Sequence, residues 1–474
     1  MVFNSLEFFV FLALTLGVYW LVRRRAQNVL LLVASYVFYG WWDYRFLSLI
    51  WISTIADFLI AQRLAATSVE SHRKRWLFGS LAVNLGILGF FKYFDFFVDS
   101  AADLLETIGL SANAPTLSIV LPIGISFYTF QTISYTFDVF RRRIEPERDI
   151  VTFGVYVAFF PQLVAGPIER AQQLLPQIQA ERVPPTLVKV WSGSWLILTG
   201  LFKKVVLADG VAAVVQTRFD SPGQHGALSL LIGVYAFSIQ IYGDFSGYSS
   251  IARGVARLFG IELMRNFEQP YLSTSISQFW RTWHISLSTW LWDYLYVPLG
   301  GSRSGRRRTY INLGLVMLIG GLWHGAAWTF VVWGGLHGFY LIVHRARGSY
   351  EVRGRPPAPR LADLWRIVGT FHLVGFAWIF FRASSLGAAF EYIGGFVRFA
   401  STAAGDGGSV VTQTVGVAVV VAATFVLDWV DRNRETYQPL LWSPLPLGVA
   451  AASMIVGLLV FSGGTLVPFI YFQF

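Results

Sequence analysis

Apolar runs about as long as a membrane is thick recur along the whole of this chain. A transmembrane helix needs about 20 predominantly apolar residues. The runs here are continuous, whereas the strands of a membrane barrel alternate apolar with polar residues. Only 14% of the 474 residues are charged, against roughly a quarter in a soluble chain. The sequence therefore predicts an all-α polytopic membrane protein. The runs lie at residues 4–22, 28–41, 45–62, 77–98, 119–140, 365–381, 410–428 and 446–461.

Clusters of basic residues separate these runs and indicate an orientation. Basic loops of a membrane protein are retained on the cytoplasmic side, and a cytoplasmic position for every cluster places the N-terminus outside. The same loops account for the net charge of +10 without a nucleic-acid partner. Cysteine is absent, which excludes disulfides, thiolate metal sites and a cysteine nucleophile. The clusters lie at residues 23–25, 71–76, 141–148, 301–308 and 344–348.

The stretch GGLWHGAAWTF places His324 near the middle of the apolar run 309–343. This run has basic clusters at both ends and would be about 50 Å long as one helix, far more than a single span needs. We therefore expect the run to enter the membrane and return, with its turn at the glycines beside His324. Those glycines are Gly320, Gly321 and Gly325.

The position of His324 predicts proton-transfer chemistry. A histidine at membrane depth is a functional residue by default, and a neutral imidazole can take a proton from a hydroxyl group near neutral pH. The alternative is a buried structural histidine. A metal site is not expected, because no carboxylate or second histidine stands at ligand spacing beside His324.

A second histidine, His284, lies in the stretch SQFWRTWHISLSTWLWDYLYVPLGG. As one continuous helix, this stretch places four polar residues on a single face at spacings of four, three and four. The other faces are aromatic and aliphatic and include Trp283. Such a stripe either lines a cavity filled by water or substrate or faces the headgroups from an interfacial helix, and the spacing favours neither. The four polar residues are Ser277, Arg281, His284 and Ser288.

Two further stretches place polar or helix-breaking residues among apolar ones. FFPQLVAGPIER interrupts an apolar run with Pro161, and proline ends or kinks a helix. SIQIYGDFSGYS places polar side chains in an apolar neighbourhood, among them those of Gln240, Tyr242, Asp244, Ser246 and Tyr248. Both stretches are typical either of helix packing or of the lining of one site shared with the histidines.

Four stretches together resemble the membrane-bound O-acyltransferase (MBOAT) family, in particular the bacterial branch that includes the membrane component of alginate O-acetylation. They occur in the order found in the family, and the resemblance covers roughly residues 1–385. The apolar runs that follow in the C-terminal part of the chain are generic and contribute little to the resemblance. The matching stretches are FFPQLVAGPIER, QIYGDFSGYSSIARGVARLFG, FWRTWHISLSTWLWDYLYVPLGG and GGLWHGAAWTFVVWGGLHG.

The resemblance implies one integral-membrane domain over residues 1–474, with a motif-bearing core at about 120–345. It also implies a ring of tilted helices around a thin central tunnel. His324 matches the family's catalytic histidine, and His284 matches its second histidine. The expected lining of the tunnel comprises Trp323, Trp283, Arg281, Ser288, Gln240, Tyr242, Asp244 and Ser246.

The resemblance further implies a reaction. Its donor is cytoplasmic acetyl-coenzyme A (acetyl-CoA), a substrate rather than a permanently bound cofactor. The acetyl group passes outward to a periplasmic partner that resembles SGNH hydrolases, and this partner acetylates an exopolysaccharide such as alginate. Two alternatives stay open: the same fold moving another acyl group, such as D-alanine onto teichoic acid, and a transporter of polysaccharide or lipid. A transporter predicts inverted repeats, and the sequence has no internal repeat.

Overall fold

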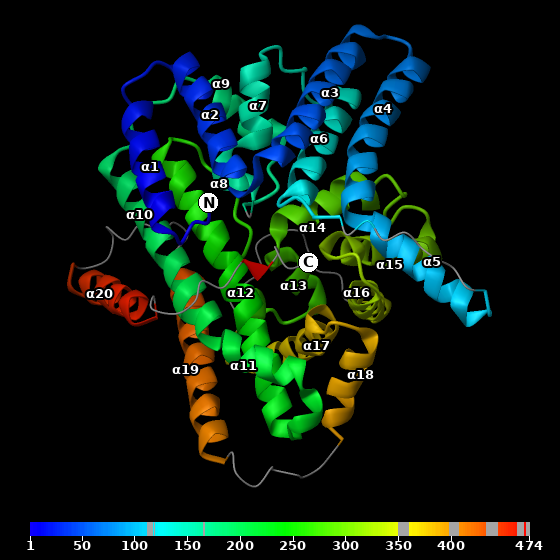
Figure 1. The fold of residues 1–474 in the computed structure, drawn as a ribbon, viewed down its shortest axis with the longest axis vertical. Coiled ribbons are helices and arrows are strands. Elements are labelled where there is room, and N and C mark those ends of the chain that lie inside the picture. Colours follow the sequence, from blue (N-terminus) through cyan, green and yellow to red (C-terminus); the bar gives the residue numbers. More distant parts are fainter. Residues whose placement is uncertain are drawn as a thin grey trace. The chain divides into compact units, whose positions relative to one another are not determined.

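The structure, a computed structural model, describes residues 1–110, 117, 119–164, 166–348, 360–397, 407–432, 444–461 and 469–470. Within these residues every regular element is a helix (Figure 1), which confirms the predicted all-α class. Four helical segments of the described chain are long and apolar enough to cross a membrane. The protein is an all-α polytopic membrane protein. The four segments are Arg24–Ala66, Glu70–Thr107, Ala227–Leu258 and Leu364–Arg382.

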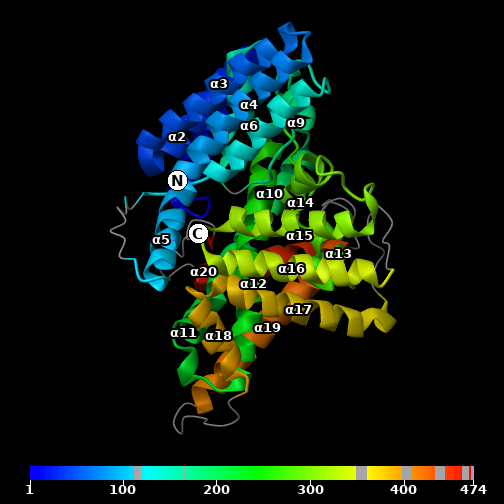
Figure 2. The same ribbon diagram turned by 90° about the vertical axis from the view of Figure 1, so that its right-hand side faces the viewer.

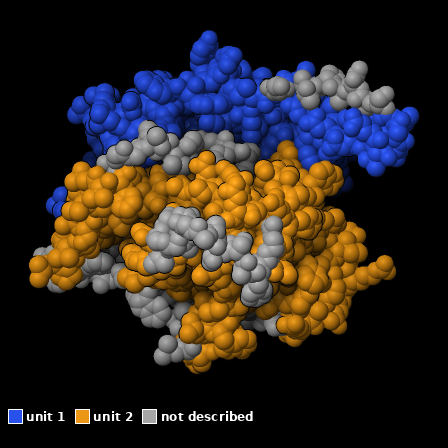
Figure 3. Space-filling model, turned by 60° about the horizontal axis from the view of Figure 1, so that its bottom comes forward, with its two compact units in different colours: residues 1–193, 252–264 blue, residues 194–251, 265–474 orange. Residues whose placement is uncertain are grey.

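The chain divides into two compact units (Figure 3), residues 1–193 with 252–264 and residues 194–251 with 265–474. Helices α10 (Leu187–Leu201) and α12 (Ala227–Leu258) contribute residues to both units. The other helices of the first unit are α1 (Leu6–Tyr19), α2 (Arg24–Asp43), η1 (Tyr44–Phe46), α3 (Leu47–Ala66), α4 (Glu70–Leu88), η2 (Gly89–Tyr93), α5 (Phe94–Thr107), α6 (Ile125–Phe140), α7 (Ile150–Ala158), α8 (Phe160–Leu163) and α9 (Ala171–Gln179).

The second unit carries both histidine stretches. Its remaining helices are η3 (Phe202–Ala208), α11 (Asp209–Asp220), η4 (Pro222–Gln224), η5 (Pro270–Leu272), α13 (Ile276–Thr282), α14 (Ile285–Leu291), η6 (Trp292–Tyr296), α15 (Gly305–His324), α16 (Trp328–Ala346), η7 (Leu361–Asp363), α17 (Leu364–Arg382), α18 (Leu386–Gly395), α19 (Gly407–Arg432) and α20 (Pro444–Phe461).

A buried polar network joins α3, α4 and α6 in the first unit, where these helices lie side by side. The fully buried carboxylate of Asp57 accepts hydrogen bonds from Ser80 Oγ at 2.6 Å and from Asn84 Nδ2 at 2.7 Å. Asn84 Oδ1 accepts in turn from Ser53 Oγ at 2.7 Å and from Thr132 Oγ1 at 3.0 Å. Because a buried polar group without a partner is costly, this network holds the three helices in one register.

Pro161 interrupts its apolar run, as the sequence predicts. α7 ends at Ala158 and α8 begins at Phe160, so Pro161 lies in the first turn of the new helix. In that position the missing N–H of proline removes no hydrogen bond from the helix.

The run around His324 forms a helical hairpin, which confirms the predicted return of the chain. α15 ends at His324, residues 325–327 form the link, and α16 begins at Trp328. Figure 2 shows α15 and α16 side by side, with α17 next to α16. The hairpin therefore places His324 at a helix end rather than within a continuous span.

Glycines allow the two helices of this hairpin to touch. A Cβ atom on Gly321 would lie 2.3 Å from the carbonyl oxygen of Phe330, and one on Gly334 would lie 2.3 Å from that of Met317. No side chain fits at either position without moving a helix. Such close backbone approach is typical of helix pairs in membranes, where small residues line the contact.

The long helix α12 carries the polar stretch SIQIYGDFSGYS into the interior. In its most apolar stretch, 78% of the residues are buried. A Cβ atom on Gly247 would lie 2.7 Å from the carbonyl oxygen of Gly200 on α10, and one on Gly200 would lie 2.6 Å from that of Gly247. The side chains of this stretch therefore meet protein rather than lipid.

Candidate active site

His324 lies among aromatic rings at the end of α15. Its side chain is buried, with 3% of its surface exposed. The ring centroids of Trp333, Trp323 and Phe381 lie 4.9, 5.0 and 5.4 Å from that of His324. These rings shield the imidazole from bulk water, so a group bound beside His324 would be the partner for any proton that the ring gains or loses.

The glycine that follows His324 is required by close packing. Gly325 is extended, with φ of −159° and ψ of 148°, and it ends the helix. A Cβ atom on Gly325 would lie 2.1 Å from the ring of Phe330. The turn predicted at the glycines therefore forms at Gly325, while Gly321 serves the helix contact.

The prediction of one continuous helix through His284 is wrong. α13 ends before this residue and α14 begins after it, and His284 itself has a positive φ of 43°. The predicted polar stripe is therefore split. Ser277, Arg281 and Ser288 line a cavity, whereas His284 is 0% exposed and is not among the residues of that lining.

A segment that precedes the helices causes the break at His284. Glu268 N donates to Thr282 O at 2.9 Å, and Ile285 N donates to Asn266 O at 2.9 Å. A continuous helix would use these groups for its own hydrogen bonds, so the pairing and the helix exclude each other. A left-handed residue other than glycine costs about 1–3 kcal/mol and persists only where its surroundings hold it.

The break brings the two histidines together. Their ring centroids lie 6.3 Å apart with the planes at 67°. Trp323 contacts both, at 5.7 Å from His284 and 5.0 Å from His324, and Phe245 of α12 packs edge-on against His284 at 4.6 Å. Two imidazoles at this separation can hold a hydroxyl group between them and move its proton, which is general acid–base chemistry.

Two polar side chains of α12, those of Tyr242 and Asp244, interact with buried charged residues. Tyr242 OH donates to Asp428 Oδ1 at 2.7 Å. Asp244 forms an ion pair with Lys204 at 2.9 Å and accepts the backbone N–H of Ile470 at 2.6 Å. Sequence reasoning missed Lys204 and Asp428, because each meets its partner only through the tertiary fold.

The other predicted lining residues have different surroundings. Trp283 is fully buried and stacks on Phe279 at 5.5 Å, with Trp378 at 5.1 Å, so it contributes packing. Gln240 Oε1 and Ser246 Oγ are buried and accept or donate no hydrogen bond within the described residues. A role for these three side chains in a tunnel stays a prediction.

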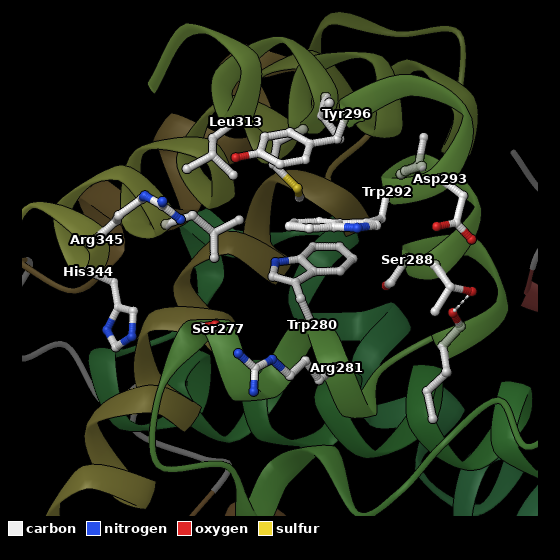
Figure 4. A pocket seen from close by; sticks show the side chains of 16 residues that line it. Ser277, Trp280, Arg281, Ser288, Trp292, Asp293, Tyr296, Leu313, His344 and Arg345 are labelled. Carbon is white, nitrogen blue, oxygen red and sulfur yellow. Dashed lines mark hydrogen bonds between the residues drawn. The ribbon is translucent and has the colours of Figure 1, made fainter. Parts of the chain in front are cut away.

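A cavity of about 670 Å³ lies within the second unit, which also holds the histidine pair (Figure 4). Its volume lies within the usual range of ligand sites. Two arginines, a histidine and several hydroxyl groups face it, together with aromatic rings and one carboxylate. The labelled lining residues are Ser277, Trp280, Arg281, Ser288, Trp292, Asp293, Tyr296, Leu313, His344 and Arg345.

One aromatic ring separates the wall of this cavity from His324. Trp280, which lines the cavity, lies 5.7 Å from Trp333, and Trp333 lies 4.9 Å from His324. Trp280 Nε1 also donates to His337 Nδ1 at 3.2 Å. His337 is fully buried, and this hydrogen bond fixes the tryptophan in the wall.

Comparison with known proteins places these features in one family. The sequence model of the MBOAT, membrane-bound O-acyltransferase family matches residues 36–349. The chain is 40% identical over 470 residues to the probable alginate O-acetylase AlgI of Azotobacter vinelandii, which covers 98% of this chain and 92% of that protein.

More distant relatives differ in the substrates that their names give. The peptidoglycan O-acetyltransferase of Helicobacter pylori is 35% identical over 429 residues, 84% of this chain and 80% of that protein. The teichoic acid D-alanyltransferase of Bacillus subtilis is 24% identical over 276 residues, 56% of this chain and 70% of that protein.

Proposed function

Because this chain belongs to the membrane-bound O-acyltransferase family, we propose that it takes acetyl groups from cytoplasmic acetyl-CoA and passes them across the membrane for O-acetylation of an exopolysaccharide such as alginate. The chain is an O-acyltransferase, and such an enzyme requires an acyl donor. The identity with the Azotobacter vinelandii protein extends over nearly the whole of both chains. The D-alanyltransferase match is weaker and shorter, which favours acetyl over D-alanyl.

The observation that carries the proposal is the buried pair of His324 and His284. In the proposed reaction His324 takes the proton of the acceptor hydroxyl as its oxygen attacks the thioester carbonyl. The carbon–sulfur bond then breaks, and the thiolate of coenzyme A receives the proton. His284 holds the reacting hydroxyl beside His324. The aromatic rings around the pair exclude water, which would otherwise hydrolyse the thioester.

The cavity next to Trp280 is the proposed donor site. Acetyl-CoA is anionic and carries an adenine ring, and guanidinium groups bind phosphates through paired hydrogen bonds. Arg281 and Arg345 line this cavity together with His344 and the ring of Trp292. The orientation proposed from the basic clusters puts the end of α16, and with it Arg345, on the cytoplasmic side, where acetyl-CoA is made.

The proposed location is the bacterial inner membrane, with the N-terminus outside. Single cysteines at residues 71–76, 141–148 and 301–308 of this cysteine-free chain should resist a membrane-impermeant thiol reagent in intact cells and react after lysis. Labelling of any of the three in intact cells would overturn the orientation. The same orientation supports a periplasmic partner of the SGNH-hydrolase type, because the acceptor polymer lies outside.

Mass analysis of the polymer tests the function itself. Cells with the gene should make polysaccharide with O-acetyl esters, and cells without it should make the same polymer unmodified. Restoring the wild-type gene should restore the esters. Two results would contradict the proposal: D-alanyl esters in place of acetyl esters, or loss of the exported polymer itself, which is what a transporter predicts.

A further inference from the structure

Asn266 contacts three consecutive residues of the turn at His284, namely His284, Ile285 and Ser286. Its side chain is 1% exposed. Asn266 Oδ1 lies 3.2 Å from Ser286 N, 2.9 Å from Ser286 Oγ and 3.1 Å from His284 Nδ1. The backbone oxygen of Asn266 accepts from Ile285 N at 2.9 Å. Its Nδ2 donates to Ser249 Oγ at 3.4 Å.

These contacts determine the hydrogen positions around His284. The backbone N–H of Ser286 can only donate, so the amide atom of Asn266 that it contacts must be the oxygen. An amide oxygen can only accept, so His284 Nδ1, which shares this oxygen, must donate to it. The Ser286 hydroxyl donates to the same oxygen, and its lone pairs face His284 Nδ1 at 3.4 Å. The ring proton of neutral His284 therefore lies on Nδ1, and Nε2 carries the lone pair.

We propose that Asn266 is a positioning residue that holds His284 in its left-handed turn as the Nδ1–H tautomer, so that Nε2 is the nitrogen that accepts a proton or a hydrogen bond from the reacting group. This inference rests on the proposed function in assigning His284 to the reaction. Asn266 does not contact the acceptor hydroxyl or the thioester in the proposed reaction. It acts through the ring of His284. The backbone oxygen of Asn266 holds the turn in place, and its side-chain oxygen selects the Nδ1–H tautomer of His284.

Solid-state NMR of the full-length protein tests the tautomer without any assay of activity. The chain has seven histidines, and the signals lost in His284→Gln identify those of His284 in protein made with isotopically labelled histidine. Nδ1 is bonded to Cγ, whereas Nε2 is bonded to Cδ2. We expect the protonated nitrogen of His284 to correlate with Cγ. A protonated nitrogen that correlates with Cδ2 would overturn the proposal even in a fully active enzyme.

Substitutions at Asn266 test the consequence for the reaction. Asn266→Asp keeps an acceptor oxygen for Ser286 and His284, so acetyl transfer should continue with the Nδ1–H signal intact. Asn266→Ala removes the acceptor, and transfer should fall on the order of 10–100-fold, by analogy with the loss of a residue that orients a metal-bound histidine. Equal activity of Asn266→Ala and wild type would refute the role, as would equal loss in folded Asn266→Ala and Asn266→Asp.

Asn312 supplies a matched control for the same substitution. It is also fully buried in the second unit, but it uses its amide nitrogen, which donates to Leu299 O at 3.2 Å and Gly301 O at 2.9 Å. Asn312→Asp replaces that donor by a carboxylate facing two carbonyl oxygens, so it should lower the amount of folded protein. Tolerance of Asn→Asp at 312 and not at 266 would contradict the assignment of the oxygen at Asn266. Loss of activity in His284→Gln checks the proposed function separately.

Discussion

The contact between α15 and α16 predicts a sharp difference between two adjacent glycines. A Cβ atom on Gly334 would lie 2.3 Å from Met317 O, which is 0.7 Å inside the 3.0 Å limit that real Cβ atoms respect. The obstacle is backbone, so Gly334→Ala must push the helices apart by at least that amount. We expect this overpacking to cost about 1–3 kcal/mol of stability.

The displacement also reaches His324, the proposed catalytic histidine. α15 ends at His324, and Trp333, the residue before Gly334, packs on the His324 ring at 4.9 Å. A misplacement of about 1 Å can cost roughly 10²-fold in rate. Gly334→Ala should therefore reduce acetyl transfer by about that factor in protein that still inserts into the membrane.

Gly335→Ala is the matched control. Its Cβ atom would meet Leu318 Cδ2 at 3.6 Å, an ordinary contact, so activity and stability should stay near wild type. The assay is acetyl ester per unit of polymer in cells, divided by the amount of protein in the membrane, together with the midpoint of heat denaturation in detergent. Wild-type activity in Gly334→Ala, or equal loss in both variants, would refute the steric reasoning.

Three further predictions follow from buried contacts and from the cavity. Trp283→Ala should lower stability by about 3–5 kcal/mol through the loss of packing, seen as less protein in the membrane; unchanged amount and heat stability would show that Trp283 is not a packing residue. Lys204→Met leaves the buried carboxylate of Asp244 without its cation and should cost about 3–5 kcal/mol, measured by heat denaturation, and a stable variant would contradict this ion pair. Arg281→Ala and Arg345→Ala should raise KM for acetyl-CoA more than they lower kcat, and an unchanged KM in both would remove the cavity as the donor site.

The hairpin of α15 and α16 could be predicted because its signals are local. Basic clusters flank the apolar run on both sides, and the length of the run exceeds one span, so the chain has to return. The glycines beside His324 mark where a turn can form. The structure adds that Gly325 makes the turn while Gly321 makes the helix contact, a division that depends on the position of Phe330.

The turn at His284 could not be predicted, because its cause is not local. The spacing of Ser277, Arg281 and His284 is that of a helix face, and nothing within the stretch forbids a helix. The break arises when Asn266, eighteen residues before His284, offers its oxygens to the N–H groups around the histidine. The local spacing of polar residues therefore does not determine which of their side chains share one surface.

The polar stretch of α12 shows the same limit. Its sequence indicates that Tyr242 and Asp244 are unusual among apolar neighbours, and both are buried. The partner of Tyr242 is Asp428, which lies 186 residues later in the chain. The partner of Asp244 is Lys204, which lies on η3. No spacing rule relates such pairs, so the sequence marks one half of each contact and the fold supplies the other.

The most direct test of the account is the rate of acetyl transfer by purified His324→Gln protein in lipid vesicles with acetyl-CoA and the acceptor. Glutamine matches histidine in reach but cannot exchange a proton near neutral pH. General acid–base catalysis typically contributes about 10²–10⁴-fold, and we predict a loss of that size with acetyl-CoA binding retained. Transfer at close to the wild-type rate would show that His324 is a packing residue and that the proposed chemistry is wrong.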